Sequence, residues 1–514
     1  MINNLLIVSY LLVIGLAWWR ARGEIYLTAA LVFTFAAPVM ELAGRRINSS
    51  YLLTALLVLL LCLELVRKRR AKRTQTLREV PQVLRIYLLL MAVVLFTYTV
   101  GFMLYGQAGW GSFLFSMAGE VNLIVMTAIL LLFLAWEAKA TRQRIFTAMG
   151  WIYIGVQLSM VLFQKLFFEP AWRLTYQFYA GDGRTEPLET ILVSDPPYFK
   201  RAYGTFYSPT LFGVASLVPT LLFAYQAIAL YRRAKLRGDK RMYKRALVSL
   251  GGSFLGALVG TFSLSKGFML SIGILLVYLL VLALMLGARP RRHVAVAWSG
   301  VAVSTVIAFV IVYLSMPSFA SGTRDYYFGF LFNPFEALTS RYGSDVSEGG
   351  EGGQAEDDCP DGECATEAPS AVVLDAGFAP GTQIPLPTDA DGQVFNPALT
   401  DGEGGGQMAE TYAIFRDHWL TGVGPLPIAG EFMGDSQIVQ VGHNGGILAL
   451  GAYLALFIWL YLKGWKEKRV VNLLLVPIIG IACISIAFLG QVISVGIMAL
   501  SLIAALPDSP SQSA

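Results

Sequence analysis

The stretch IVQVGHNGGILALGAYLALFIW, residues Ile438–Trp459, decides the fold class of this chain. It is mostly apolar, with one histidine and one asparagine, His443 and Asn444, near its leading edge. About 20 consecutive apolar residues are needed to cross a bilayer as a helix. The stretch therefore predicts a transmembrane helix, with one of the chain's three histidines where that helix begins.

The composition extends this interpretation to the whole chain of 514 residues. Hydrophobic residues make up 56% and charged residues only 14%, whereas soluble domains carry about 25% charged residues. The start, MINNLLIVSYLLVIGLAWWR, lacks a basic leader and a small-residue cleavage site, so we interpret it as a first span rather than a signal peptide. We predict an all-α, polytopic integral membrane protein. Its net charge of +5 lies mostly in short loops and indicates no nucleic-acid partner.

About 12–13 transmembrane helices are expected, because the last two apolar runs are joined only by a Gly-Gln pair and also fit one broken hairpin. The thirteen runs are Leu5–Trp19, Ile25–Leu42, Leu52–Val66, Leu84–Tyr105, Phe113–Trp136, Ile145–Phe163, Thr210–Leu230, Leu247–Leu264, Phe268–Leu286, Val294–Leu314, Gly445–Leu462, Leu473–Leu489 and Val492–Leu506.

Positive charge predicts the orientation of these spans, because cationic loops stay in the cytoplasm. With thirteen spans, five cationic segments fall on one side, and this places the N-terminus outside and the C-terminus inside. Arg45 and Arg46 are exceptions, because they land outside. The five segments are Arg67–Arg73, Lys139–Arg144, Arg232–Arg245, Ala288–His293 and Lys463–Arg469.

This topology divides the chain into regions. Residues 1–314 hold ten spans and an outer loop at about 164–209, residues 315–442 form a large extracytoplasmic loop, residues 443–506 hold the C-terminal spans, and 507–514 are a cytoplasmic tail. Within the large loop, about 345–408 is an acidic insertion that is too polar to offset its ordering entropy, so we predict that it is flexible. Residues just before the Gly/Pro turn at about 416–425 predict a short surface helix.

Cys359 and Cys364 lie in this insertion, in the sequence EDDCPDGEC. An extracytoplasmic compartment is oxidising, so a local disulfide is expected between them. A cation site built from the same acidic run is the alternative. Cys62 and Cys483 lie within spans, where packing is their expected role.

Three cations are expected at helix edges on the outer side. Lys266 lies in the tight hairpin TFSLSKGFML, where it is either a snorkelling side chain or an anion clamp helped by Ser263, Ser265 and the helix N-terminus that follows. Arg201 precedes the seventh span and Arg341 follows the tenth. Together they predict a site for a polyanionic head group near the membrane surface.

The sequence around His443, taken by itself, supports two interpretations of this residue. An imidazole titrates near neutral pH and can accept the proton of a hydroxyl, which suits a general base at head-group depth. The alternative is an interface histidine at a helix start, with Asn444 as the N-cap.

Three motifs resemble the O-antigen ligase and O-antigen polymerase superfamily of membrane proteins. GVGPLPIAGEF…VGHNGGILALGAYL is similar to its closing motif, in which a Gly-x-Gly turn is followed by His-Asn and a span; RAYGTFYSPTLFG and TFSLSKGFML are similar to its two earlier segments. The resemblance covers about Arg201–Leu462. Lys266 stands where arginine is usual, so bidentate phosphate binding is lost there. The acidic insertion also separates Arg341 from the surface helix.

The resemblance implies a GT-C-like glycosyltransferase that works without a metal or cofactor, in a bacterial inner membrane with its site facing the periplasm or exterior. The donor would be a glycan on a polyprenyl diphosphate, and the acceptor a hydroxyl of another glycan or of a lipid-A core. It implies that His443 and Arg341 are catalytic, and that Arg201, Lys266, Ser265 and Asn444 bind substrate. The alternative is a flippase for the same lipid, but the sequence has no internal repeat, and within the spans Glu120 stands out as the charged residue.

Overall fold

A computed structural model describes most of the expected spans and little of the large loop. The described residues are 2–35, 37–42, 45–71, 80–105, 109–167, 170–171, 174, 202, 204–206, 209–285, 288–315, 371–373, 383–385, 416–425, 437–467, 470–485 and 492–505.

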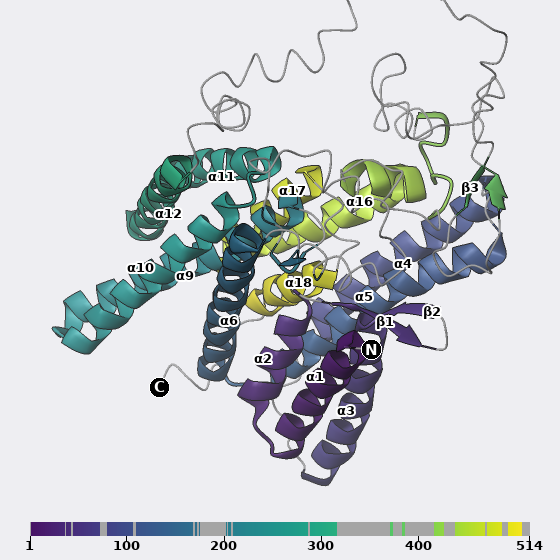
Figure 1. The fold of residues 1–514 in the computed structure, drawn as a ribbon, viewed down its shortest axis with the longest axis horizontal. Helices are drawn as coiled ribbons and strands as arrows, with labels where there is room; N and C mark the ends of the chain where they lie inside the picture. The colour runs from purple at the N-terminus through teal and green to yellow at the C-terminus, as the bar shows by residue number, and fades with distance from the viewer. Residues whose placement is uncertain are drawn as a thin grey trace, which may run out of the picture. The chain divides into compact units, whose positions relative to one another are not determined.

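Helices dominate these residues (Figure 1). They are α1 (Ile2–Trp19), α2 (Gly23–Phe33), α3 (Ser50–Ala71), α4 (Val80–Tyr105), α5 (Trp110–Trp136), α6 (Lys139–Leu166), α9 (Pro209–Arg237), α10 (Lys240–Thr261), α11 (Lys266–Met285), α12 (Ala288–Ser315), α16 (Gln437–Lys466), α17 (Val470–Ser485) and α18 (Val492–Ala504). The strands are β1 (Val39–Leu42), β2 (Arg45–Asn48), β3 (Ala371–Val373) and β4 (Gln383–Pro385).

A helix lies at each of the thirteen expected positions. Among the described residues, 7 helices are long and apolar enough to cross a membrane, namely α3, α4, α5, α6, α9, α11 and α16. Side chains such as Leu5, Leu89 and Leu284 are exposed on the helices, as expected where a lipid bilayer replaces water. The chain is therefore an all-α, multi-pass, membrane-embedded protein.

The second expected span is shorter than the sequence suggested. Instead of running from Ile25 to Leu42, helix α2 ends at Phe33, and β1 and β2 follow as an antiparallel pair in which Glu41 lies opposite Arg46. Pro38 explains the difference, because a helix usually ends before the residue that precedes a proline. The 11 residues of α2 rise about 17 Å, roughly half the thickness of a hydrocarbon core.

Residues Ser318–Gly404 form a compact unit separate from the helices. Within it the structure describes one antiparallel pair, β3 with β4, in a segment for which the sequence predicted flexibility. Of the expected surface helix, the structure describes residues 416–417, which are helical and are followed by a turn. Cys359, Cys364 and Arg341 lie outside the described residues. Cys62 and Cys483 are within α3 and α17, as expected, but only Cys483 is buried; Cys62 is exposed on its helix, so a packing role is not supported there.

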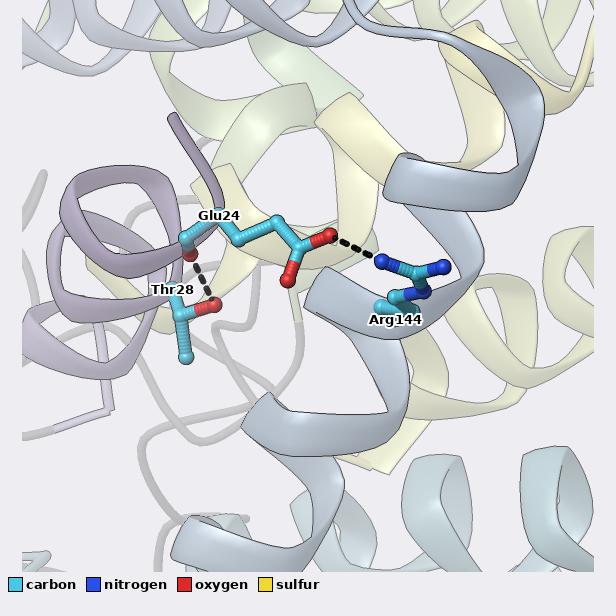
Figure 2. A network of polar contacts seen from close by, with 3 residues as sticks. All are labelled: Glu24, Thr28 and Arg144. Atoms are coloured by element: carbon cyan, nitrogen blue, oxygen red, sulfur yellow. Dashed lines mark hydrogen bonds and ion pairs between the residues drawn. The ribbon is translucent and has the colours of Figure 1, made fainter. Parts of the chain in front are cut away.

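A polar contact joins the beginnings of α2 and α6. The Arg144 guanidinium donates to Glu24 Oε1 at 3.0 Å, and Thr28 Oγ1 on the next turn donates to the Glu24 carbonyl at 2.5 Å (Figure 2). Both charged side chains are well exposed, so the pair contributes at most about 1 kcal/mol. The ion pair matters more for the topology, because it shows that the α1–α2 turn lies on the same side as the cationic segment Lys139–Arg144.

Helices α9 and α10 form a close hairpin because α10 presents glycines at every fourth position (Figure 1). A Cβ at Gly252 would lie 3.0 Å from the Phe223 ring, and one at Gly256 would lie 2.7 Å from Thr220 Oγ1. Gly260 continues the row. Small residues spaced in this way let membrane helices approach closely, and here they bring the start of α9 beside the α10–α11 hairpin.

The orientation can be tested with a reporter that fluoresces only in the cytoplasm. We expect a bright signal from a fusion after Arg241, in the first turn of α10 and within the cationic segment Arg232–Arg245, because cationic segments are retained in the cytoplasm. A fusion within Ser347–Gly406 should be dark. A bright signal at the second position would reverse the topology and move the proposed site to the other side.

Candidate functional site

His443 and Asn444 lie next to a break in helix α16 rather than at its start. The helix begins at Gln437, and its regular geometry fails at Gly446, where φ is 62° and ψ is −161°. Only glycine adopts this region of backbone space readily. The expected span from Gly445 is therefore the second half of a broken helix, and Asn444 is not its N-cap.

The turn at 416–425 fills this break with main-chain hydrogen bonds. Val423 N donates to the His443 carbonyl at 2.8 Å, and Gly424 N donates to the Asn444 carbonyl at 3.0 Å. In return, Ile447 N donates to the Trp419 carbonyl at 2.7 Å. In an unbroken helix, Ile447 N would bond to His443. The inserted turn thus satisfies groups that the break would otherwise leave unpaired.

Glycines allow the backbones to approach this closely. Gly422 and Gly424 have φ of 63° and 85°, and a Cβ on Gly422 would overlap with the His443 carbonyl. On the other side of the turn, a Cβ on Gly101 of α4 would lie 2.5 Å from the Thr421 carbonyl. The Gly-x-Gly turn that the sequence placed before His-Asn is therefore packed between α4 and α16.

Asn444 orients the His443 ring. His443 Nδ1 lies 3.0 Å from Asn444 Oδ1. An amide oxygen can only accept, so Nδ1 carries the proton in the neutral ring and Nε2 keeps its lone pair. The Asn444 side chain also hydrogen-bonds Tyr98 of α4. Both His443 and Asn444 are 2% exposed.

Two further titratable residues lie near this pair. His418, in the inserted turn, interacts electrostatically with His443, and its ring packs on Tyr105 with 4.3 Å between centroids. Glu120, on α5, is half-buried and interacts electrostatically with Tyr98 and Tyr453. A carboxyl group within a membrane span usually has a functional or pairing reason to be there.

A second cluster forms around the loop before α9. Gln164 of α6 binds the Gly204 peptide on both sides, with Nε2 2.8 Å from its carbonyl and Oε1 3.0 Å from its N–H. Gln157, two turns earlier, binds Thr205 in the same way, with its Oε1 2.9 Å from the Thr205 N–H and its Nε2 2.6 Å from Oγ1. The two amides hold the loop against the C-terminal half of α6.

This loop is tied to the α10–α11 hairpin. Ala202 N donates to the Phe262 carbonyl at 3.1 Å. Within the hairpin, Ser265 is 2% exposed; its N–H lies 3.3 Å from Ser263 Oγ, and its carbonyl accepts from Met269 N at 3.1 Å in the first turn of α11. Two segments that the sequence singled out separately are thus joined by the main chain.

The predicted cations are described only in part. Lys266 is the first residue of α11, and the structure describes its backbone alone. Arg201 and Arg341 lie outside the described residues, although Ala202, the neighbour of Arg201, is placed beside the hairpin. The structure therefore brings together His443 and Asn444 in one cluster, and the neighbours of Arg201 and Lys266 in another.

Contacts along α2 place both clusters toward the end of the helices that lies away from Arg144. The beginning of α2 is joined to Arg144, whereas Phe35, just beyond its end, accepts from Thr205 at 3.4 Å. Ser50, which follows the strand pair, accepts from Asn122 of α5 at 3.0 Å. The start of α5 lies farther in that direction and packs on Phe102 beside the inserted turn.

The sequence analysis missed several residues that build these clusters. Tyr98 had no signal, because tyrosines are frequent at membrane interfaces. Gln157 and Gln164 did carry one: they are seven residues apart within an apolar run and so share one helix face. Polar amides on one face of a span indicate a polar partner, which here is the loop at Gly204.

Gly446→Ala tests the importance of the break. We expect a loss of roughly 2–4 kcal/mol in the free energy of unfolding, because φ is unsuited to alanine and a Cβ would overlap with the Leu420 carbonyl. Gly451→Ala is the matched control, since Gly451 is helical with open space around it, and it should be neutral or slightly stabilising. Equal thermal unfolding of the two variants in detergent would contradict the inserted turn.

No family model, curated protein or solved structure matches this chain.

Proposed function

We propose that this protein transfers a glycan from a polyprenyl-diphosphate carrier to a sugar hydroxyl at the outer face of the membrane. The observation that carries the proposal is the pairing of His443 with Asn444. An imidazole whose Nδ1–H is bound by an amide oxygen keeps the lone pair of Nε2 for a proton and has a fixed orientation. This arrangement suits removal of a proton from a hydroxyl, and it lies beside the turn at 416–425.

The reaction exchanges one bond for another at the anomeric carbon of the donor. The acceptor oxygen attacks this carbon, and the bond from the carbon to the diphosphate oxygen breaks. The electron pair leaves with the polyprenyl diphosphate, and the acceptor proton passes to His443 Nε2. Proton removal by a positioned base contributes about 10²–10⁴-fold to such a rate.

The hairpin cluster is the proposed site for the diphosphate. Its support is the main-chain bond from Ala202 to Phe262, which brings the backbone next to Arg201 close to the segment that leads into Lys266. Cations and a helix N-terminus together favour an anionic group. Arg201, Lys266 and Arg341 would hold the diphosphate and stabilise the charge that develops as it leaves.

Transport of the same lipid-linked glycan is the second candidate, and one pair of observations favours it. Interrupted helices and carboxyl groups within spans are features of transporters, and this chain has the break at Gly446 and the half-buried Glu120. An assay of glycan transfer in detergent distinguishes the two candidate functions, because transport cannot be measured without two compartments separated by a membrane. Glycan length in cells that lack the protein then distinguishes a polymerase from a ligase.

His443→Ala should lower turnover by about 10²–10⁴-fold, measured as glycan transfer in detergent from a purified lipid-linked donor. His443→Gln retains hydrogen-bonding groups but cannot accept a proton at neutral pH, so its turnover should stay low. Donor binding should change little in either variant. Recovery by the glutamine variant would limit His443 to orienting the acceptor, and near-normal turnover of the alanine variant would refute the assignment.

Lys266→Ala should raise the donor KM about tenfold or more, since a charge-assisted hydrogen bond is lost. Lys266→Arg should match or improve on the native protein, because a guanidinium can hold a phosphate with two parallel bonds. Membrane levels of both variants must equal those of the native protein. An alanine variant with normal donor KM would leave Lys266 as a snorkelling side chain.

A further inference from the structure

The segment of α16 just before the break is enclosed by protein on every side. All seven residues from Gln440 to Gly446 are buried, whereas the second half exposes residues such as Ile447, Leu448 and Leu454. A helix buried all round is normally apolar. This short segment instead carries three polar side chains, Gln440, His443 and Asn444, which are 7%, 2% and 2% exposed.

One of these side chains has an unused polar atom. The Gln440 amide oxygen is buried and has no hydrogen-bond partner within the part of the chain that the structure describes. The Asn444 amide, by contrast, is engaged by His443 and Tyr98. An unpaired buried acceptor is costly, especially at membrane depth, and native structures retain few of them. Binding of a ligand is one reason to retain this one.

The helix places Gln440 on the same face as the proposed base. Residues three and four positions apart in a helix are neighbours on its surface, with about 5–6 Å between their Cβ atoms. Gln440 is three residues before His443 and four before Asn444, and the helix is regular until Gly446. Its amide therefore lies one turn from the imidazole, toward the start of α16.

A sugar fits this arrangement because it carries several hydroxyls on one ring. We infer that Gln440 binds a hydroxyl of the acceptor sugar that does not react, while His443 meets the hydroxyl that does. The hydroxyl donates to Oε1, the atom that has no partner among the residues that the structure describes. This inference rests on the proposed function and extends it, because it assigns a residue that selects and orients the acceptor.

Gln440→Leu tests the inference in the purified full chain, with a lipid-linked donor and graded concentrations of acceptor. We expect the acceptor KM to rise about tenfold, the effect of leaving one buried hydroxyl unpaired, with the donor KM unchanged. A series of deoxy acceptors sharpens the result. The native protein should lose about tenfold in kcat/KM for one deoxy acceptor, and the variant should not distinguish that acceptor from its parent.

Asn472→Leu is the matched control. Asn472 of α17 is also fully buried, and among the described residues its amide oxygen has no partner. Its amide nitrogen is bound to the Leu460 carbonyl near the other end of α16. Its substitution should leave the acceptor KM and the deoxy pattern unchanged. If Gln440→Leu does not fold, Gln440→Met matches the length of the native side chain and tests the same hydrogen bond.

The outcomes separate this inference from the proposal beneath it. If the native protein transfers glycan and the Gln440 variant has a native-like acceptor KM and deoxy pattern, the role of Gln440 is overturned. The proposed transfer reaction then still stands. A native protein that transfers no glycan from the lipid-linked donor overturns both. A rise in acceptor KM shared by the Asn472 control would also overturn the inference, because it would show a general effect of removing buried amides.

Discussion

Backbone hydrogen bonding at membrane depth is the constraint on which this structure depends. Hydrocarbon offers no partner for an N–H or carbonyl group, so irregular backbone survives there only where protein supplies one. The break at Gly446 meets this requirement by exchange: the turn at 416–425 donates to the carbonyls of His443 and Asn444 and accepts from Ile447. A helix that is interrupted in this way keeps its main chain paired and acquires an enclosed polar segment.

The loop before α9 follows the same constraint by a different means. Here side-chain amides take the place of the backbone, because Gln157 and Gln164 each bind both a donor and an acceptor on the loop. Each net bond contributes only about 1 kcal/mol, but an unpaired peptide in this position would cost more. Glycines are needed in both clusters because a Cβ at Gly204 or Gly422 would overlap with the groups that make these bonds.

The sequence predicted the positions of the helices well, because apolar length is a strong signal. It failed between Phe33 and Asn48, where an apolar run contains Pro38 and the strands β1 and β2 replace the end of a helix. It identified the Gly-x-Gly turn and His443-Asn444 as a unit, and the structure joins them. The sequence analysis placed the start of this span at Gly445, whereas α16 begins at Gln437. A helix that is broken at one residue has a similar composition on both sides of the break, so the sequence does not reveal that the two halves are one helix. Tyr98, the partner of Asn444 on α4, was beyond prediction, since contacts between residues far apart in sequence leave no local pattern.

The inserted turn has a consequence for how the protein is made. Gly101 and Phe102 of α4 are synthesised more than 300 residues before Thr421 and Gly424, their neighbours in the finished structure. Translation proceeds at about 5–20 residues per second. For tens of seconds, the face of α4 that later contacts the turn at 416–425 must therefore contact other helices or lipid instead. The two halves of α16 can settle around the turn only after that. The histidine cluster is thus among the last features to form, and the translocation machinery must tolerate a broken helix that is not yet supported.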